Sequence, residues 1–80
     1  MKAKVFITLK KAVLDPQGKA VEGTLQRLGY SNVESVRVGK YVEIDVVAEN
    51  ADDAQKQVAD MCEKLIANTV IEDYRIEVES

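Results

Sequence analysis

Hydrophobic and polar side chains alternate along the middle of the chain, from Val36 to Val46. The even-numbered positions are apolar except for Lys40, and the odd-numbered positions are charged, glycine or tyrosine. A period of two predicts a β-strand with one buried face, because successive side chains point to opposite sides of a sheet. The phase continues across Gly39-Lys40, where a two-residue hairpin loop would set a charge beside the buried face. Residues 33–47 therefore form either one long, bent strand or two strands joined by a loop with an odd number of residues.

A single strand over residues 33–47 would be longer than the domain that contains it. Its length would be about 50 Å at about 3.3 Å per residue. A compact domain of 80 residues has a radius of gyration of roughly 12 Å and a diameter of about 30 Å. A strand that overhangs its sheet has unpaired backbone groups, which favour pairing with another chain. This pattern indicates a subunit of an assembly.

The flanking segments predict a strand and a helix before this region. Residues 2–10 alternate as a first strand. A helix then begins at Asp15-Pro16, with Asp15 as N-cap and Pro16 at the first helical position, where its missing N–H is not needed. Gly29 is expected to end this helix in a left-handed conformation. Gly18 and Gly23 lie inside the helix, where glycines either permit close packing on a sheet, which we favour, or leave room for the backbone of a partner.

A second helix and a last strand follow the central region. Asn50 is the expected N-cap of the helix, with Asp53 in a capping-box position and Asn68 as the stop. Residues 70–78 alternate as the last strand. The helix carries an apolar stripe that is expected to face the sheet, made of Ala54, Val58, Met61, Cys62, Leu65 and Ile66.

The order of these elements predicts one domain over residues 1–80. It is an α+β two-layer sandwich of the βαββαβ type with its helices on one side of the sheet, a relative of the ferredoxin-like fold. The two central strands are either separate or merged into one long, bent strand at Gly39.

Composition excludes several kinds of chemistry. The chain has no histidine and one cysteine, Cys62, so it can build neither a Cys/His zinc site nor a triad that needs histidine. Cys62 lies on the apolar stripe and is expected to be a buried, inert thiol. The net charge of −3 disfavours nucleic-acid binding. We expect no catalytic residues, no cofactor and no metal in this chain.

The same composition bears on location. The N-terminal segment lacks the apolar core of a signal peptide, and no apolar run reaches the ~20 residues that cross a membrane. A single cysteine suits a reducing compartment. We therefore expect a cytoplasmic protein with no membrane partner.

Five residues are candidates for contacts with partner proteins. Arg37, Lys40 and Tyr41 lie in the central strand region, and arginine and tyrosine are enriched at binding hot spots. Lys40 interrupts the apolar face, so it either contacts a partner or reaches past the edge of the sheet into solvent. Asp15 and Gln17 at the start of the first helix are further candidates, although helix capping already accounts for Asp15.

Four spaced motifs in register resemble the PurS family, the small subunits of phosphoribosylformylglycinamidine (FGAM) synthase. The resemblance covers nearly the whole chain. The motifs are residues 13–18 (VLDPQG), 28–30 (LGY), 36–41 (VRVGKY), and 61–68 (MCEKLIAN) running on to 70–74 (VIEDY).

The resemblance implies a non-catalytic subunit in de novo purine biosynthesis. In the family's complex, a large amidotransferase subunit uses ATP and Mg²⁺, and a glutaminase subunit releases ammonia. The small subunit bridges the two and helps to shield ammonia in transit. It forms a homodimer or a dimer of dimers.

A second function class stays open on the residues alone. Dimers of ferredoxin-like fold also serve as regulatory modules that hold a small molecule between subunits, because fold does not fix function. A scaffold would retain its large partner and its glutaminase on purification, whereas a regulatory module would show ligand-dependent melting by itself.

Overall fold

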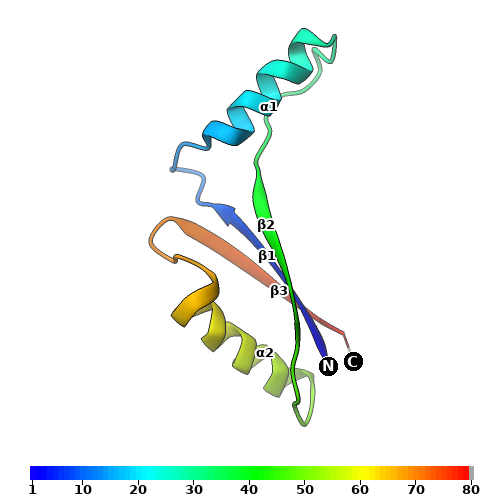
Figure 1. The fold of residues 1–80 in the computed structure, drawn as a ribbon, viewed down its shortest axis with the longest axis vertical. Coiled ribbons are helices and arrows are strands. Elements are labelled where there is room, and N and C mark those ends of the chain that lie inside the picture. The colour runs from blue at the N-terminus through cyan, green and yellow to red at the C-terminus, as the bar shows by residue number, and fades with distance from the viewer. Residues whose placement is uncertain (80) are drawn as a thin grey trace.

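The fold is a three-stranded antiparallel sheet with one helix packed on it and a second helix beyond its end (Figure 1). The computed structural model describes residues 1–79. In chain order the elements are β1 (Lys2–Leu9), α1 (Pro16–Arg27), β2 (Gly39–Asp45), α2 (Ala51–Met61), a π-helical turn (Cys62–Ile66) and β3 (Glu72–Glu79). The predicted α+β class is confirmed. Within the described residues, the central region contributes a single strand.

The first strand of the chain is the middle strand of the sheet, whose order is β2-β1-β3. Both neighbours run antiparallel to β1, so Lys2 lies opposite Asp45 on one side and Glu79 on the other. Alternation along β1 directs three side chains into the core, as the period of two predicts: Ala3, Val5 and Ile7, each at most 1% exposed.

The strand β2 is shorter than the predicted strand over residues 33–47. Gly39 pairs with Thr8, and β1 ends at Leu9. Val38 is therefore level with Leu9, and residues 33–37 lie past the end of β1, where the described residues provide no strand to complete a ladder. At the other end, backbone pairing continues to Val46, which exchanges hydrogen bonds of 2.8 and 2.9 Å with Met1. Gly39 neither turns nor breaks the chain: it is the residue at which β2 enters the sheet.

Glycine at position 39 has a steric cause. A Cβ there would overlap the carbonyl oxygen of Ile7 and lie 2.8 Å from the Cγ2 of Thr8. The backbone of β2 thus approaches β1 more closely at this point than a side chain would allow.

The predicted ends of α1 are confirmed. The side chain of Asp15 caps the helix by accepting a hydrogen bond of 2.9 Å from the Gly18 N–H, and Pro16 is the first helical residue. Gly29 ends the helix with φ of +105°. The amides of Gly29 and Tyr30 donate to Gln26 and Leu25, which is the hydrogen-bond pattern of a Schellman motif.

The helix α1 does not pack on the sheet, in contrast to the expectation that both helices cover it. Figure 1 shows α1 above the end of the sheet, whereas α2 lies along one sheet face, against β3 and β1. The buried Gly18 accordingly lies against the carbonyl oxygen of Val36 in the returning chain, not against a strand of the sheet. We call residues 12–38, which form α1 and the extended segment after it, the arm.

The helix α2 begins at the predicted N-cap. At its end the direction of successive side chains shifts relative to that of a regular α-helix. Asn50 accepts a hydrogen bond of 2.8 Å from the Asp53 N–H, and the Asp53 carboxylate in turn accepts one from Glu49. Ala54, Val58 and Cys62 are fully buried. The prediction that Leu65 belongs to the same stripe is wrong, because it is 86% exposed.

The π-helical turn explains the exposure of Leu65. The Ala67 N–H donates to the carbonyl of Cys62, five residues earlier, at 3.0 Å. This wider turn rotates the following side chains relative to an α-helix, so Leu65 points to solvent and Ala67 becomes buried.

The molecule is elongated. Its principal extents are 50 × 26 × 14 Å and its radius of gyration is 15.8 Å, against roughly 12 Å for a compact domain of this length. Much of the difference comes from the arm, which continues the long axis of the sheet (Figure 1). The buried core is correspondingly confined to β1, α2 and the turn after α2.

Candidate partner-binding surfaces

Asp15 connects two segments of the arm. Besides capping α1, its carboxylate accepts a hydrogen bond of 2.8 Å from the Val38 N–H, directly before β2. The N–H groups of Gly18 and Val38 hold the pKa of the Asp15 carboxyl below its ordinary value, because they stabilise the charged form. Asp15 is therefore a structural link as well as a cap, and it is only half-buried.

Arg37 connects the arm to the sheet. Its guanidinium donates to the Thr8 hydroxyl at 3.1 Å and to the carbonyl oxygen of Leu9. Since β1 ends at Leu9, Arg37 provides a donor for a carbonyl at the end of the strand. Its side chain is exposed, and both of these bonds come from one of its terminal nitrogens.

Gln17 and Lys40 lie at a shallow cleft of about 360 Å³ between the start of α1 and the end of the sheet. Gln17 is exposed on the first turn of α1. The ammonium of Lys40 lies 3.4 Å from the Ile66 carbonyl and 3.7 Å from the Glu72 carboxylate. The side chain of Lys40 thus extends past the apolar face to polar groups at the edge of the sheet. This agrees with the second of the two roles predicted for Lys40, in which it reaches past the sheet edge.

Tyr41 lies on the opposite face of the sheet, which no helix covers; we call it the open face. Its ring packs against Phe6 with centroids 5.1 Å apart, and its hydroxyl donates to Glu43 at 3.0 Å. The guanidinium of Arg75 covers Phe6 at 4.4 Å from the ring centroid. Partial burial, followed by the Glu43 carboxylate, raises the pKa of Tyr41.

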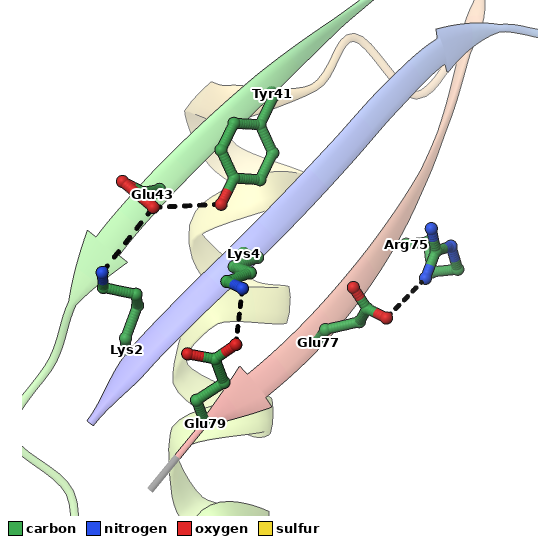
Figure 2. Close-up of polar contacts among 7 residues, drawn as sticks. All are labelled: Lys2, Lys4, Tyr41, Glu43, Arg75, Glu77 and Glu79. Carbon is green, nitrogen blue, oxygen red and sulfur yellow. Dashed lines mark hydrogen bonds and ion pairs between the residues drawn. The ribbon is translucent and has the colours of Figure 1, made fainter.

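Ion pairs cover the rest of the open face, as Figure 2 shows with α2 behind the sheet. The ammonium of Lys4 lies 2.5 Å from Glu79, and that of Lys2 lies 3.7 Å from Glu43. Both pairs join neighbouring strands. The Lys4–Glu79 contact lowers the pKa of Glu79 and raises that of Lys4. Such exposed pairs contribute little to stability because water and salt screen them, so this face is a polar surface suited to water or to a polar partner.

Two apolar surfaces were not identified from the sequence. On the arm, Leu14, Val21 and Leu28 are 71%, 42% and 68% exposed. On the sheet, Val42 and Ile44 of β2 face the side of α2 but are only partly buried, because α2 lies over β1 and β3. The helical spacing of Val21, Leu25 and Leu28 in the sequence is typical of an apolar face, but only the position of α1 shows that this face is left uncovered by residues 1–79 (Figure 1).

The five candidate residues therefore do not form one patch. Asp15, Gln17 and Lys40 line the cleft, Arg37 joins the arm to the sheet, and Tyr41 lies on the open face. Within residues 1–79, no group of three or more acidic, cysteine or histidine side chains is arranged to hold a metal ion. None of the helices in this part of the chain is long and apolar enough to cross a membrane.

A small α+β domain with an unpartnered helical arm and a half-covered apolar sheet defines a class: subunits that complete their fold against other chains. Large exposed apolar surfaces on so small a core are typical of such proteins. Comparisons with known proteins identify the family within this class. The chain belongs to the PurS family, since residues 2–80 match the family model described as phosphoribosylformylglycinamidine (FGAM) synthase.

Curated relatives carry the same description. PurS of FGAM synthase from Bacillus subtilis is 54% identical over 79 residues, which cover 98% of this chain and 92% of that protein. PurS from Methanocaldococcus jannaschii is 45% identical over 78 residues, covering 98% and 94%.

Solved structures agree with the fold. The crystal structure of M. jannaschii PurS, a subunit of formylglycinamide ribonucleotide amidotransferase in the purine biosynthetic pathway, matches with a TM-score of 0.88 at 44% identity. That match covers 99% of this chain and 95% of the other. A chain in the structure of PurLQS from Thermotoga maritima matches with a TM-score of 0.87 at 32% identity, covering 95% and 93%.

Proposed function

We propose that this chain is the non-catalytic small subunit of an FGAM synthase and that it acts as a dimer joining the other subunits. Membership of the PurS family supports the enzyme and the pathway, and the T. maritima PurLQS structure supports a complex of several subunits. ATP, Mg²⁺ and glutamine are then handled by the partner subunits. The proposed location is the cytoplasm, where purine synthesis would take place.

The proposal of a dimer is supported mainly by two exposed apolar surfaces in one chain. The arm exposes Val21 and Leu28, and the sheet leaves Val42 and Ile44 beside α2 partly uncovered. The arm cannot cover its own sheet, because it starts beyond the end of β1 (Figure 1). In a symmetric dimer the arm of each chain lies beside α2 on the sheet of the other, so both surfaces are buried.

The extended segment 33–38 favours the same arrangement. It runs in line with β2 but outside the ladder (Figure 1). The Val33 and Val38 amides are bonded within the chain, so the backbone groups offered to a strand from a second chain are those between them. The family resemblance and the unbroken alternation through Gly39 both include the second half of this segment, residues 36–38.

The open face is then the surface left for the larger subunits. It lies opposite the face used in the dimer and presents Tyr41 among ion pairs (Figure 2). We assign Tyr41 and Gln17, which are exposed, to contacts with these subunits. Arg37, Lys40 and Asp15 bond within the chain, and their part in partner binding is indirect.

Reconstitution tests this function. The purified large and glutaminase subunits are mixed with glutamine, ATP and formylglycinamide ribonucleotide, with or without this chain. We expect glutamine-dependent turnover only when the chain is present. Full turnover without it would overturn the scaffold role.

A variant within the same experiment tests the dimer. Val21→Glu places a charge on the apolar side of α1 without lowering helix propensity, and it should give monomers in sedimentation and weak turnover. Gln55→Glu adds the same charge on the exposed side of α2 and should leave both unchanged. A Val21→Glu chain that dimerises normally would contradict the arm exchange.

A further inference from the structure

Three chain segments meet where the arm leaves the sheet. They are the end of β1 at Thr8 and Leu9, the start of α1 at Asp15, and the segment just before β2 at Arg37 and Val38. We call this meeting point the junction. Within residues 1–79, α1 makes no extensive contact with any strand of the sheet (Figure 1). The direction of α1 therefore depends on the bonds at the junction.

Two polar side chains hold the junction together. Asp15 accepts from the Gly18 and Val38 N–H groups at 2.9 and 2.8 Å, so one carboxylate binds the first turn of α1 to the returning chain. Arg37 donates to the Thr8 hydroxyl and the Leu9 carbonyl, so the returning chain is bound to the end of β1. Bonds with a charged partner are stronger than neutral ones.

A glycine makes this approach possible. The Cα of Gly18 lies so close to the returning chain that a Cβ would overlap the Val36 carbonyl oxygen and lie 2.6 Å from the Asp15 carboxylate. A helix cap does not need a second chain segment close by. At α2, for example, Asn50 caps the helix by accepting a single hydrogen bond of 2.8 Å from the Asp53 N–H. The extra bond of Asp15 to Val38 therefore serves the position of the helix relative to β2, and not the helix end itself.

We propose that Asp15 and Arg37 are positioning residues that set the direction of the arm and thereby the affinity of the chain for its second copy. The proposal rests on the dimer described above. An arm fixed in its bound direction loses less conformational freedom on association than a free one, so fixing it tightens binding without adding a contact. Neither residue needs to touch the partner.

Asp15→Asn separates the two roles of Asp15. Asparagine caps helices as well as aspartate does, so the bond to Gly18 is retained. Its side chain has one oxygen instead of two, and its nitrogen is a donor that cannot accept from the Val38 N–H. The Val38 amide should lose its protection from hydrogen exchange while Gly18 keeps its protection.

The direction of the arm is measured as a distance. Spin labels are attached at Arg27→Cys near the end of α1 and at Gln55→Cys on α2, with excess unlabelled chain so that only distances within a chain are seen. Cys62 is fully buried and should not react. We expect a narrow distance distribution in the parent chain and a broad one for Asp15→Asn. The dimer dissociation constant, from sedimentation, should rise about tenfold.

Two further variants complete the design. Arg37→Gln removes the charged link to Leu9 and should also broaden the distance distribution, which keeps the proposal testable if Asp15→Asn folds poorly. Asn50→Ala removes the cap of α2, which lies away from the junction, and should lower stability while leaving the arm distance and the dissociation constant unchanged.

The outcomes separate this inference from the proposed function. A narrow distance distribution and an unchanged dissociation constant in both junction variants would overturn the inference and leave the dimer intact. A parent chain that stays monomeric would overturn the dimer and, with it, the effect on affinity. Even then, the distance measurement would decide whether the junction sets the direction of the arm.

Discussion

At the scale of single residues, two glycines in one helix have opposite environments. A Cβ on Gly18 would overlap the Val36 carbonyl oxygen, whereas a Cβ on Gly23 would meet only the Arg27 side chain, at 3.5 Å. From the sequence both glycines read alike, as places where the helix packs closely. The structure shows close packing for Gly18 alone, and against the returning chain of the arm.

Alanine at these two positions should therefore have opposite effects. Gly18→Ala forces backbone atoms apart and should destabilise the fold by about 1–3 kcal/mol, the usual cost of overpacking. Gly23→Ala should stabilise it by about 0.4–1 kcal/mol, because it restricts the unfolded chain without strain. Urea denaturation of the two variants measures both. Equal effects would contradict the close approach of α1 to Val36.

At the scale of elements, the sequence predicted what each segment is better than where it lies. The period of two along β1, the cap at Asp15 and the glycine end of α1 depend on local chemistry, and each is confirmed. The position of α1 depends on where β1 stops, which the pattern of one segment does not contain. The same holds for the candidate site: the alternation placed Tyr41 correctly on the polar face, opposite Lys40, but the separation of Tyr41 from Arg37, which shares its phase, follows only from the start of β2 at Gly39.

The π-helical turn gives a prediction at this scale. Val58 and Leu65 occupy the same predicted stripe, but Val58 is fully buried and Leu65 is 86% exposed. Val58→Ala should cost roughly 2 kcal/mol, because it leaves a cavity in the core. Leu65→Ala should change stability by less than about 0.5 kcal/mol. If Leu65→Ala is as destabilising as Val58→Ala in thermal or urea unfolding, the shift of phase after Met61 is wrong or a partner covers Leu65.

At the scale of the whole molecule, the core is thin for the length of the chain. The buried core residues gather around β1 and α2, and the arm contributes none of them. A chain built in this way gains part of its stability from association, so its apparent stability is linked to the concentration of the protein.

Melting should accordingly depend on protein concentration. A tenfold increase changes the free energy of a dimer by about 1.4 kcal/mol, and two chains of 80 residues unfold with an entropy of about 0.34 kcal/mol/K. We expect Tm to rise by about 4 °C per tenfold increase in concentration. Calorimetry at two concentrations measures the shift, and Val21→Glu should abolish it. A Tm independent of concentration would show that the monomer is stable alone.

The position of β1 has a consequence for how the chain is made. The middle strand is the first to be synthesised, yet one of its two neighbours is the last: Lys2 pairs with Glu79. Translation of such a chain takes on the order of ten seconds, and during that time β1 has an unfilled edge. The sheet closes only after β3 has left the ribosome, so the middle strand waits for the last of the three strands before the core can form.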